Sequence, residues 1–168
     1  MTSTTTGIRA QLLTPPSCGE LVTSVVTLAG LQPSRGAGVA LLVTDHDDPS
    51  VADQWSVDSF PHLVVRLGHQ SVRVGPFVQP GVTACLRCLA AAGMPAEPAR
   101  AAYADLDPSL LTVGLGWAVR DLASWNAGEL PTTWSTTVTI RADLAPESTR
   151  WPRHPHCGCS WGLDVAVG

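Results

Sequence analysis

The chain has 168 residues, of which 45% are apolar, and fourteen acidic residues against ten arginines and no lysine give a net charge of −4. This composition excludes a disordered chain, and the acidic balance argues against a nucleic-acid-binding surface. The sequence contains no apolar stretch of about 18 residues, the length that a membrane span needs. Its start lacks the basic and apolar segments of a secretion signal, so we expect a cytoplasmic protein with reduced cysteines.

The first part of the chain predicts an arm followed by one domain. Residues 1–17 are rich in Thr and Ser and end near a Pro-Pro turn, which indicates a flexible N-terminal arm, and residues 18–168 are expected to form a single domain. The apolar run 20–31 fits either a helix or a strand. Residues 39–43, Val-Ala-Leu-Leu-Val, predict a buried strand that ends at the acidic turn 45–49.

The second part predicts further strands and one long helix. Residues 63–67 and 71–74 predict two strands, and the prolines and glycines after them place residues 85–88 on a loop. Residues 109–127 are the best helix candidate, because apolar residues recur every three or four positions and a glycine follows as a stop. Residues 132–144, rich in Thr and Val, predict a long strand. Together these elements predict a mixed α/β fold.

Four of the five cysteines form two close pairs, Cys85 with Cys88 and Cys157 with Cys159. Zinc takes four thiolate or imidazole ligands in a tetrahedron, and a Cys-x-x-Cys turn brings two sulfurs near one ion. The single residue inside the second pair, Gly158, allows the tighter bite that this spacing needs. The leading interpretation is therefore a zinc site formed by Cys85, Cys88, Cys157 and Cys159.

Two neighbouring histidines offer a rival ligand set, in which His154 or His156 replaces one sulfur. Metal-free buried cysteines or disulfides are the remaining interpretation, which two close pairs in a reducing compartment make unfavourable. A site with four thiolates leaves no open position for water, so we expect a structural zinc rather than a catalytic one. Trp151 and Trp161 would shield the metal, and the fifth cysteine, Cys18, is interpreted as a thiol without function.

Other polar residues have simpler interpretations. Asp45, Asp47 and Asp48 are expected to form a solvated turn rather than a site for a hard metal ion. His62 and His69 flank a predicted strand, but neither has a carboxylate or serine partner at a spacing typical of catalysis. The sequence therefore assigns no catalytic and no cofactor-binding residue.

Two blocks of the sequence resemble a known family. The run PHLVVRLGHQSVRVGPFVQPGVTACLRCLA, residues 61–90, is followed near the end by WPRHPHCGCSWG, residues 151–162. In this order the blocks resemble the ThiF-like cyclodehydratase partner proteins of actinobacterial thiazole/oxazole-modified peptide clusters, and the match extends over residues 39–162. The resemblance implies a fold related to ubiquitin-activating enzymes, with a mixed sheet, flanking helices and a structural zinc bound by the four cysteines above.

The resemblance also implies partners. Full-length members bind the leader of a ribosomally made precursor peptide through an N-terminal winged helix, and present it to a YcaO-type enzyme that uses ATP to form azoline rings. Only 38 residues precede the strand at Val39, so we expect a short form without this module. Its expected partners are the precursor peptide and a YcaO-type enzyme, a separate leader-binding protein, or both. Relatives commonly dimerise, which makes a homodimer an additional expectation.

Nucleotide binding by the chain itself is not expected. The nearest match to a Gly-x-Gly-x-x-Gly loop is SRGAGVALL, in which Gly36 and Gly38 precede a strand instead of following it, and we interpret both as turn residues. The lack of lysine removes a common phosphate-binding side chain.

Three function classes follow from these observations. The sequence favours a non-catalytic scaffold subunit of azoline-forming peptide biosynthesis, with segment 132–140 able to accept a peptide if it lies at a sheet edge. Whether the chain is an enzyme stays open, because the alternative is a ThiF-like enzyme with its own ATP-dependent adenylation or cyclodehydration activity. A zinc-ribbon adaptor for nucleic acid or an unrelated protein is the third class, and the negative charge disfavours it.

Overall fold

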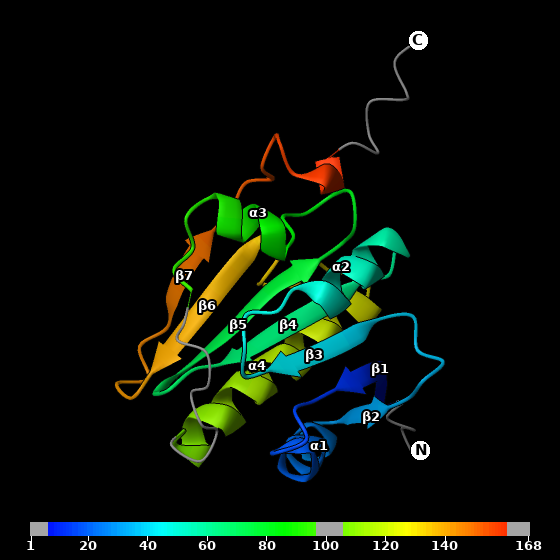
Figure 1. Cartoon of the computed structure of the whole chain (residues 1–168). Helices are drawn as coiled ribbons and strands as arrows, with labels where there is room; N and C mark the ends of the chain where they lie inside the picture. Colours follow the sequence, from blue (N-terminus) through cyan, green and yellow to red (C-terminus); the bar gives the residue numbers. More distant parts are fainter. Residues whose placement is uncertain (1–6, 97–105, 161–168) are drawn as a thin grey trace.

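The computed structural model describes residues 7–96 and 106–160, which form a seven-stranded sheet with helices on both faces (Figure 1). The strands are β1 Ile8–Leu13, β2 Leu31–Pro33, β3 Ala40–Thr44, β4 His62–Leu67, β5 Ser71–Val78, β6 Thr136–Arg141 and β7 Glu147–Arg150. The helices are α1 Gly19–Leu28, α2 Ser50–Val57, α3 Leu86–Ala91 and α4 Pro108–Asn126, with a 3-10 turn η2 at Gly158–Ser160. The expected mixed α/β fold is confirmed.

The two halves of the sheet differ in strand direction. The strand order is β2-β1-β3-β4-β5-β6-β7. β2, β1, β3 and β4 run parallel, whereas β5, β6 and β7 each run antiparallel to the preceding strand. The carboxyl ends of β1, β3 and β4 therefore lie at the same end of the sheet. The carboxyl end of β5 lies at the opposite end of the sheet, where Val78 pairs with His62 at the start of β4.

Both faces of the sheet are covered. α1 and α4 pack on one face and contribute Val22, Val26, Leu111 and Leu115 to the main core. α2 and α3 cover the other face, where Trp55 and Leu86 contact a smaller cluster of Leu42, Ala52 and Val64. β4 is buried along its whole length because helices lie on both of its sides. The apolar runs of β3 and β4 in the sequence reflect this double burial.

α4 confirms the helix predicted at residues 109–127. The carboxylate of Asp107 accepts a hydrogen bond from the backbone N–H of Ser109 at 2.8 Å, and Pro108 occupies the first turn. Gly128, with a φ of 78°, follows the last turn. Four of the five residues expected to face the core are fully buried and the fifth, Trp125, packs against it; the four are Leu111, Leu115, Ala118 and Leu122.

The central strands also agree with expectation. β3, β4 and β5 occupy the segments predicted at residues 39–43, 63–67 and 71–74, with β5 continuing to Val78. The apolar run 20–31, which fitted helix or strand equally, holds most of α1 and the first residue of β2. Val22 and Val26 lie one helical turn apart and are the buried residues of α1.

The expected arm over residues 1–17 is wrong for residues 8–13, which form β1. β1 lies inside the sheet, where it pairs with β2 on one side and β3 on the other. The six residues of this strand lie between a Thr-rich segment and two prolines, so the loop-forming neighbours concealed its pattern.

Two further expectations need correction. Residues 85–88 do not lie on a loop throughout, because Cys85 is the N-cap residue of α3 and Cys88 lies within that helix. The strand predicted at residues 132–144 is shorter and spans Thr136–Arg141 as β6. It is also not an edge strand, since β7 pairs along its outer side, so the proposed peptide acceptor at residues 132–140 is not supported.

Candidate metal centre

The upstream cysteine pair is positioned by the end of β5. A tight turn follows Val78, in which the Thr83 hydroxyl donates to the Phe77 carbonyl at 3.1 Å and accepts from the Gln79 N–H at 2.8 Å. Cys85 has an extended backbone, and Cys88 lies in the first turn of α3. Residues three apart face the same side of a helix, so the two sulfurs lie 3.7 Å apart.

The downstream pair is positioned by the segment after β7. The Trp151 indole Nε1–H donates to the Thr137 hydroxyl at 2.8 Å, which attaches this segment to β6. The Cys157 N–H donates to the carbonyl of His154 at 3.0 Å. The Arg153 guanidinium donates to the carbonyl of Cys159 at 2.8 Å. These contacts fold residues 151–159 back over the upstream pair.

Ser135, the residue before β6, joins the two segments that carry the cysteine pairs. Its hydroxyl accepts a hydrogen bond from the N–H of Ala84 at 3.1 Å, one residue before Cys85. Its carbonyl accepts a hydrogen bond from the N–H of Trp151 at 2.7 Å. One residue therefore sets the distance between the segments that carry the two cysteine pairs. The sequence offered no signal for this role, because a serine in a Thr- and Ser-rich run is unremarkable.

The structure brings all four predicted cysteines together. The sulfurs of Cys85 and Cys157 lie 3.6 Å apart and those of Cys88 and Cys159 lie 3.3 Å apart, and all four ligand atoms lie within 4.8 Å of one another. Zinc–sulfur bonds of about 2.3 Å in a tetrahedron place sulfurs about 3.8 Å apart. The cluster thus has the dimensions needed to hold a metal ion.

Burial and mutual proximity govern the acidity of these thiols. Burial raises the pKa of Cys85 above its usual range, and burial together with the neighbouring thiol of Cys88 raises the pKa of Cys159 to about 11. Burial also opposes ionisation of Cys88, but hydrogen bonds from the backbone of His154 and Cys85 and from neighbouring thiols lower its pKa overall. The surroundings therefore favour ionisation of Cys88 and oppose ionisation of Cys85 and Cys159. A bound cation would favour the ionised form of these two thiols.

The rival histidines are not part of this cluster. Within residues 7–96 and 106–160, the group close enough to hold a metal consists of the four cysteines alone. The His156 N–H donates to the Nδ1 atom of His154 at 3.3 Å, and their rings lie 5.8 Å apart. Trp151 packs against the cluster, as expected for a shielding residue, whereas Trp161 lies outside the described residues.

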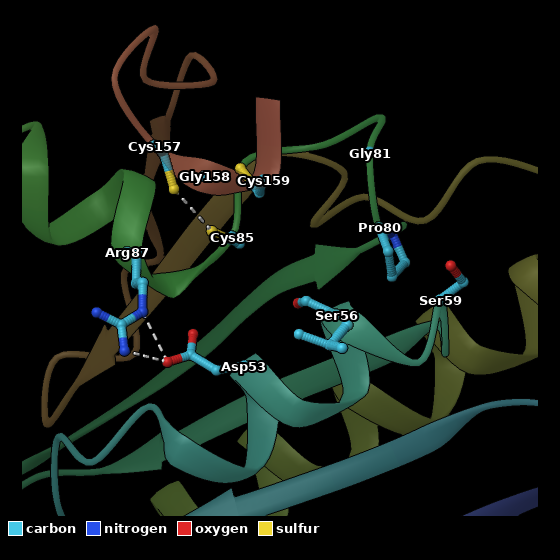
Figure 2. A pocket seen from close by; sticks show the side chains of 11 residues that line it. Asp53, Ser56, Ser59, Pro80, Gly81, Cys85, Arg87, Cys157, Gly158 and Cys159 are labelled. Atoms are coloured by element: carbon cyan, nitrogen blue, oxygen red, sulfur yellow. Dashed lines mark hydrogen bonds and ion pairs between the residues drawn. The ribbon is translucent and has the colours of Figure 1, made fainter. Parts of the chain in front are cut away.

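A cavity of about 640 Å³ separates the cysteines from α2 (Figure 2). Cys85, Cys157 and Cys159 lie on one side of it, and Ser56 and Ser59 lie on the other. The Arg87 side chain of α3 bridges to the Asp53 carboxylate of α2 at 2.6 Å. Cys159 is the least buried of the four cysteines and reaches the cavity wall.

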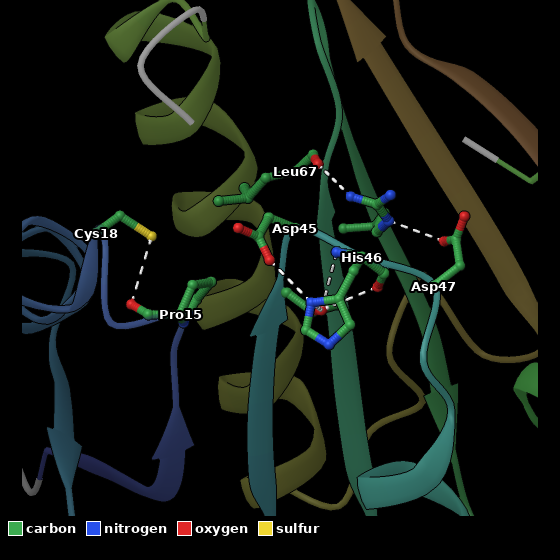
Figure 3. A network of polar contacts seen from close by, with 8 residues as sticks. Pro15, Cys18, Asp45, His46, Asp47 and Leu67 are labelled. Carbon is green, nitrogen blue, oxygen red and sulfur yellow. Dashed lines mark hydrogen bonds and ion pairs between the residues drawn. The ribbon is translucent and has the colours of Figure 1, made fainter. Parts of the chain in front are cut away.

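A separate polar network lies at the other end of the sheet, next to the carboxyl ends of β3 and β4 (Figure 3). Asp45 pairs with the imidazole of His46 at 2.9 Å. Asp47 is not merely a solvated turn residue, since its Oδ1 atom lies 2.8 Å from the guanidinium of Arg66 and 3.7 Å from that of Arg73. A charged residue inside the apolar run of β4 was the sequence signal for this pair, and its partner could not be inferred.

A crevice of about 180 Å³ lies beside the carboxyl ends of β1 and β3. A dinucleotide-binding fold would carry its glycine-rich loop after β1, but this loop reads Thr-Pro-Pro-Ser-Cys. The Cys18 thiol donates to the Pro15 carbonyl at 3.9 Å, and Cys18 is buried. Gly36 and Gly38 occupy the turn and bend before β3, as expected.

The two histidines beside β4, His62 and His69, lie in different surroundings. His62 is fully buried, and its Nδ1 atom hydrogen-bonds to the carbonyl of Phe60 at 2.8 Å. Its ring lies 5.4 Å from that of Trp55, and burial lowers the pKa of the imidazole. His69 is an exposed residue of the turn between β4 and β5.

Comparisons with known proteins identify the fold. No family model and no curated protein matches the chain. The heterocyclase TruD superimposes with a TM-score of 0.70 at 22% identity over 92% of this chain and 27% of its own. A heterocyclase in complex with substrate and cofactor gives 0.68 at 22% identity over 92% of this chain and 25% of its own. E. coli MccB gives 0.59 at 14% identity over 76% of this chain and 40% of its own.

None of the helices in the described ranges has the length and apolar character to cross a membrane.

The similarities to solved structures establish a shared fold, and the chain spans about a quarter of the length of the two heterocyclase structures. The chain therefore has the fold found in part of the heterocyclase TruD and in MccB.

Proposed function

We propose that this chain is an accessory scaffold subunit of azoline-forming peptide biosynthesis, held together by a structural zinc. It would assemble in the cytoplasm with the precursor peptide and with a YcaO-type cyclodehydratase, a separate leader-binding protein, or both. One observation carries the proposal. Four cysteines with the dimensions of a metal site join two segments of a fold that heterocyclases share.

The chemistry of the cluster favours a structural role for zinc. Cys85, Cys88 and Cys157 are buried, and four sulfurs would complete a tetrahedron without an open position for water. Zinc bound in this way would supply cohesion rather than Lewis-acid chemistry. The protein's own residues fix the ligands: Ser135 sets the spacing of the two segments, and the carbonyl of His154 orients Cys157.

The carboxyl ends of β1 and β3 support a role without nucleotide chemistry. Pro15 and Pro16 lack the N–H groups that a phosphate cradle uses, and the 180 Å³ crevice is smaller than the pockets of about 300 Å³ or more that usually hold small-molecule ligands. This arrangement favours the scaffold role over the alternative of ATP-dependent adenylation by the chain itself.

Reconstitution tests the proposal. The chain is mixed with a YcaO-type cyclodehydratase, the separate leader-binding protein, the precursor peptide, ATP and magnesium, and ring formation is followed by mass spectrometry as loss of one water per ring. We expect rings only when the chain is present, and none with a Cys157→Ser, Cys159→Ser variant. Cys18→Ser is the matched control, since it also removes a buried thiol but lies outside the cluster.

The same preparation separates the scaffold from the alternative enzyme. The chain alone is assayed for ATP–pyrophosphate exchange with the precursor peptide. No exchange is expected from the scaffold. Exchange by the chain alone, abolished by substitutions in the loop after β1, would instead establish the adenylating enzyme.

A further inference from the structure

A second cavity, of about 90 Å³, lies between the carboxyl ends of β3 and β4 and helix α3. A water molecule needs roughly 10–15 Å³ of such space, so the cavity has room for a small polyatomic group. Its walls are of two kinds. Val64, Leu86, Ala90 and Met94 form an apolar side. The polar side holds the two arginines Arg66 and Arg73 together with Thr44, His46, Asp47 and Asp48.

The two arginines are placed there by the sheet. Arg66 of β4 and Arg73 of β5 are directly opposite each other in the antiparallel pair, and they lie on the same face. Like charges at such positions repel, and the carboxylate of Asp47 offsets this repulsion. The Oδ1 atom of Asp47 approaches both guanidiniums, at 2.8 Å from Arg66 and 3.7 Å from Arg73.

Arg66 has a donor that the protein leaves open. Its side chain is only 3% exposed. The Nε atom donates to Asp47 and Nη1 donates to the carbonyl of Leu67, but Nη2 is buried without a hydrogen-bond partner. Figure 3 shows Asp47 and Leu67, the two residues that accept these hydrogen bonds. A buried charged group with an unused donor is rare unless a water molecule, a ligand or an ion completes its contacts.

We propose that this cavity binds a small oxyanion, the carboxylate or phosphate group of a ligand, through Arg66 and Arg73. Guanidinium groups match these anions because their N–H groups form a planar fork. The apolar wall would contact the carbon chain that carries a carboxylate, which favours that class over free phosphate. α3 contributes Cys88 to the metal centre and Leu86 and Ala90 to this cavity, so the two sites share one helix. The inference is independent of the peptide-biosynthesis proposal.

Titration of the 15N-labelled protein with sodium acetate, and separately with sodium phosphate, tests this site. The Nε–Hε signals of Arg66 and Arg73 are followed by NMR against sodium chloride at the same ionic strength. We expect saturable shifts at these two residues with acetate or phosphate and none with chloride. The anion with the lower Kd identifies the ligand class.

Three variants make the result specific. Arg66→Gln removes the open donor and should weaken binding about tenfold or more, the loss expected for one hydrogen bond to a charged group. Ala90→Leu fills the cavity while keeping both charges, and decides the test if Arg66→Gln does not fold. Arg120→Gln, which removes an exposed arginine from α4, should leave the Kd unchanged. Saturable shifts with neither anion, or equal binding by Ala90→Leu and the wild type, would overturn the proposal.

Discussion

Replacement of Asp121 by alanine should destabilise the protein and loosen the metal centre together. Asp121 is fully buried in α4, and its carboxylate accepts hydrogen bonds of 2.5–3.0 Å from the N–H and hydroxyl groups of Thr132 and Thr133. These residues begin the loop that leads to Ser135, which holds the segments bearing both cysteine pairs.

The expected cost follows from which donors keep access to water. Thr132 is exposed, so its two groups can turn to solvent when the carboxylate is removed. Thr133 is fully buried, and its N–H and hydroxyl would lose their partner. Each buried unsatisfied donor costs about 1–3 kcal/mol, so Asp121→Ala should lower the free energy of unfolding by about 2–6 kcal/mol.

Urea denaturation at one fixed zinc concentration measures this change, because bound metal shifts stability by mass action. Asp58→Ala is the matched control: that carboxylate is exposed and accepts from the Gln54 side chain, so its loss should stay within about 0.5 kcal/mol. Zinc affinity should fall in Asp121→Ala and not in the control. A destabilisation equal to that of Asp58→Ala, with unchanged zinc affinity, would refute the reasoning.

Three further predictions concern the helix–sheet contact, pH and capping. A Cβ atom at Gly114 would lie 2.3 Å from Val72, whereas one at Gly116 meets nothing within 4 Å. Thermal unfolding should therefore show a lower Tm for Gly114→Ala, and a gain of about 1 kcal/mol for Gly116→Ala from helix propensity; an equal gain at both would contradict the packing. Burial lowers the pKa of His62, so the unfolded chain binds the proton more readily and stability should fall as pH drops below about 6.5. For one proton, the free energy of unfolding changes by at most about 1.4 kcal/mol per pH unit. This slope should shrink in His62→Leu, and an unchanged slope would show that other groups cause the pH dependence. Asp107→Ala removes the N-terminal cap of α4 and should lower the free energy of unfolding by about 1 kcal/mol. A substitution of an exposed residue elsewhere on α4 should leave the free energy of unfolding unchanged.

The four-cysteine cluster and the long helix were predictable because both depend on local pattern. The spacing of Cys85 with Cys88 and of Cys157 with Cys159 indicates a shared ion, and the structure brings their sulfurs together across 72 residues of chain separation. α4 combines a cap, an apolar period and a terminal glycine, so each local signal agrees with the others. Such agreement allows a helix or strand to be predicted from a single sequence.

The remaining features depend on tertiary context. β1 is a strand because it pairs on both sides, and its own sequence carries only weak strand character. The pairing of Arg66 with Asp47 joins residues 19 positions apart, and it requires the sheet to place the end of β4 beside the loop after β3. The role of Ser135 likewise appears only once β6 lies beside both cysteine segments. Contacts of this kind have no periodic signature in the sequence.

Metal content, measured together with thiol accessibility, tests the central claim most directly. The wild type, the Cys157→Ser, Cys159→Ser variant and the Cys18→Ser control are purified without added chelator. The scaffold account predicts one zinc per chain and protected thiols in the wild type and the control, both lost in the double variant together with cooperative unfolding. A wild-type protein that is folded, free of metal and reactive at all four clustered thiols would contradict it.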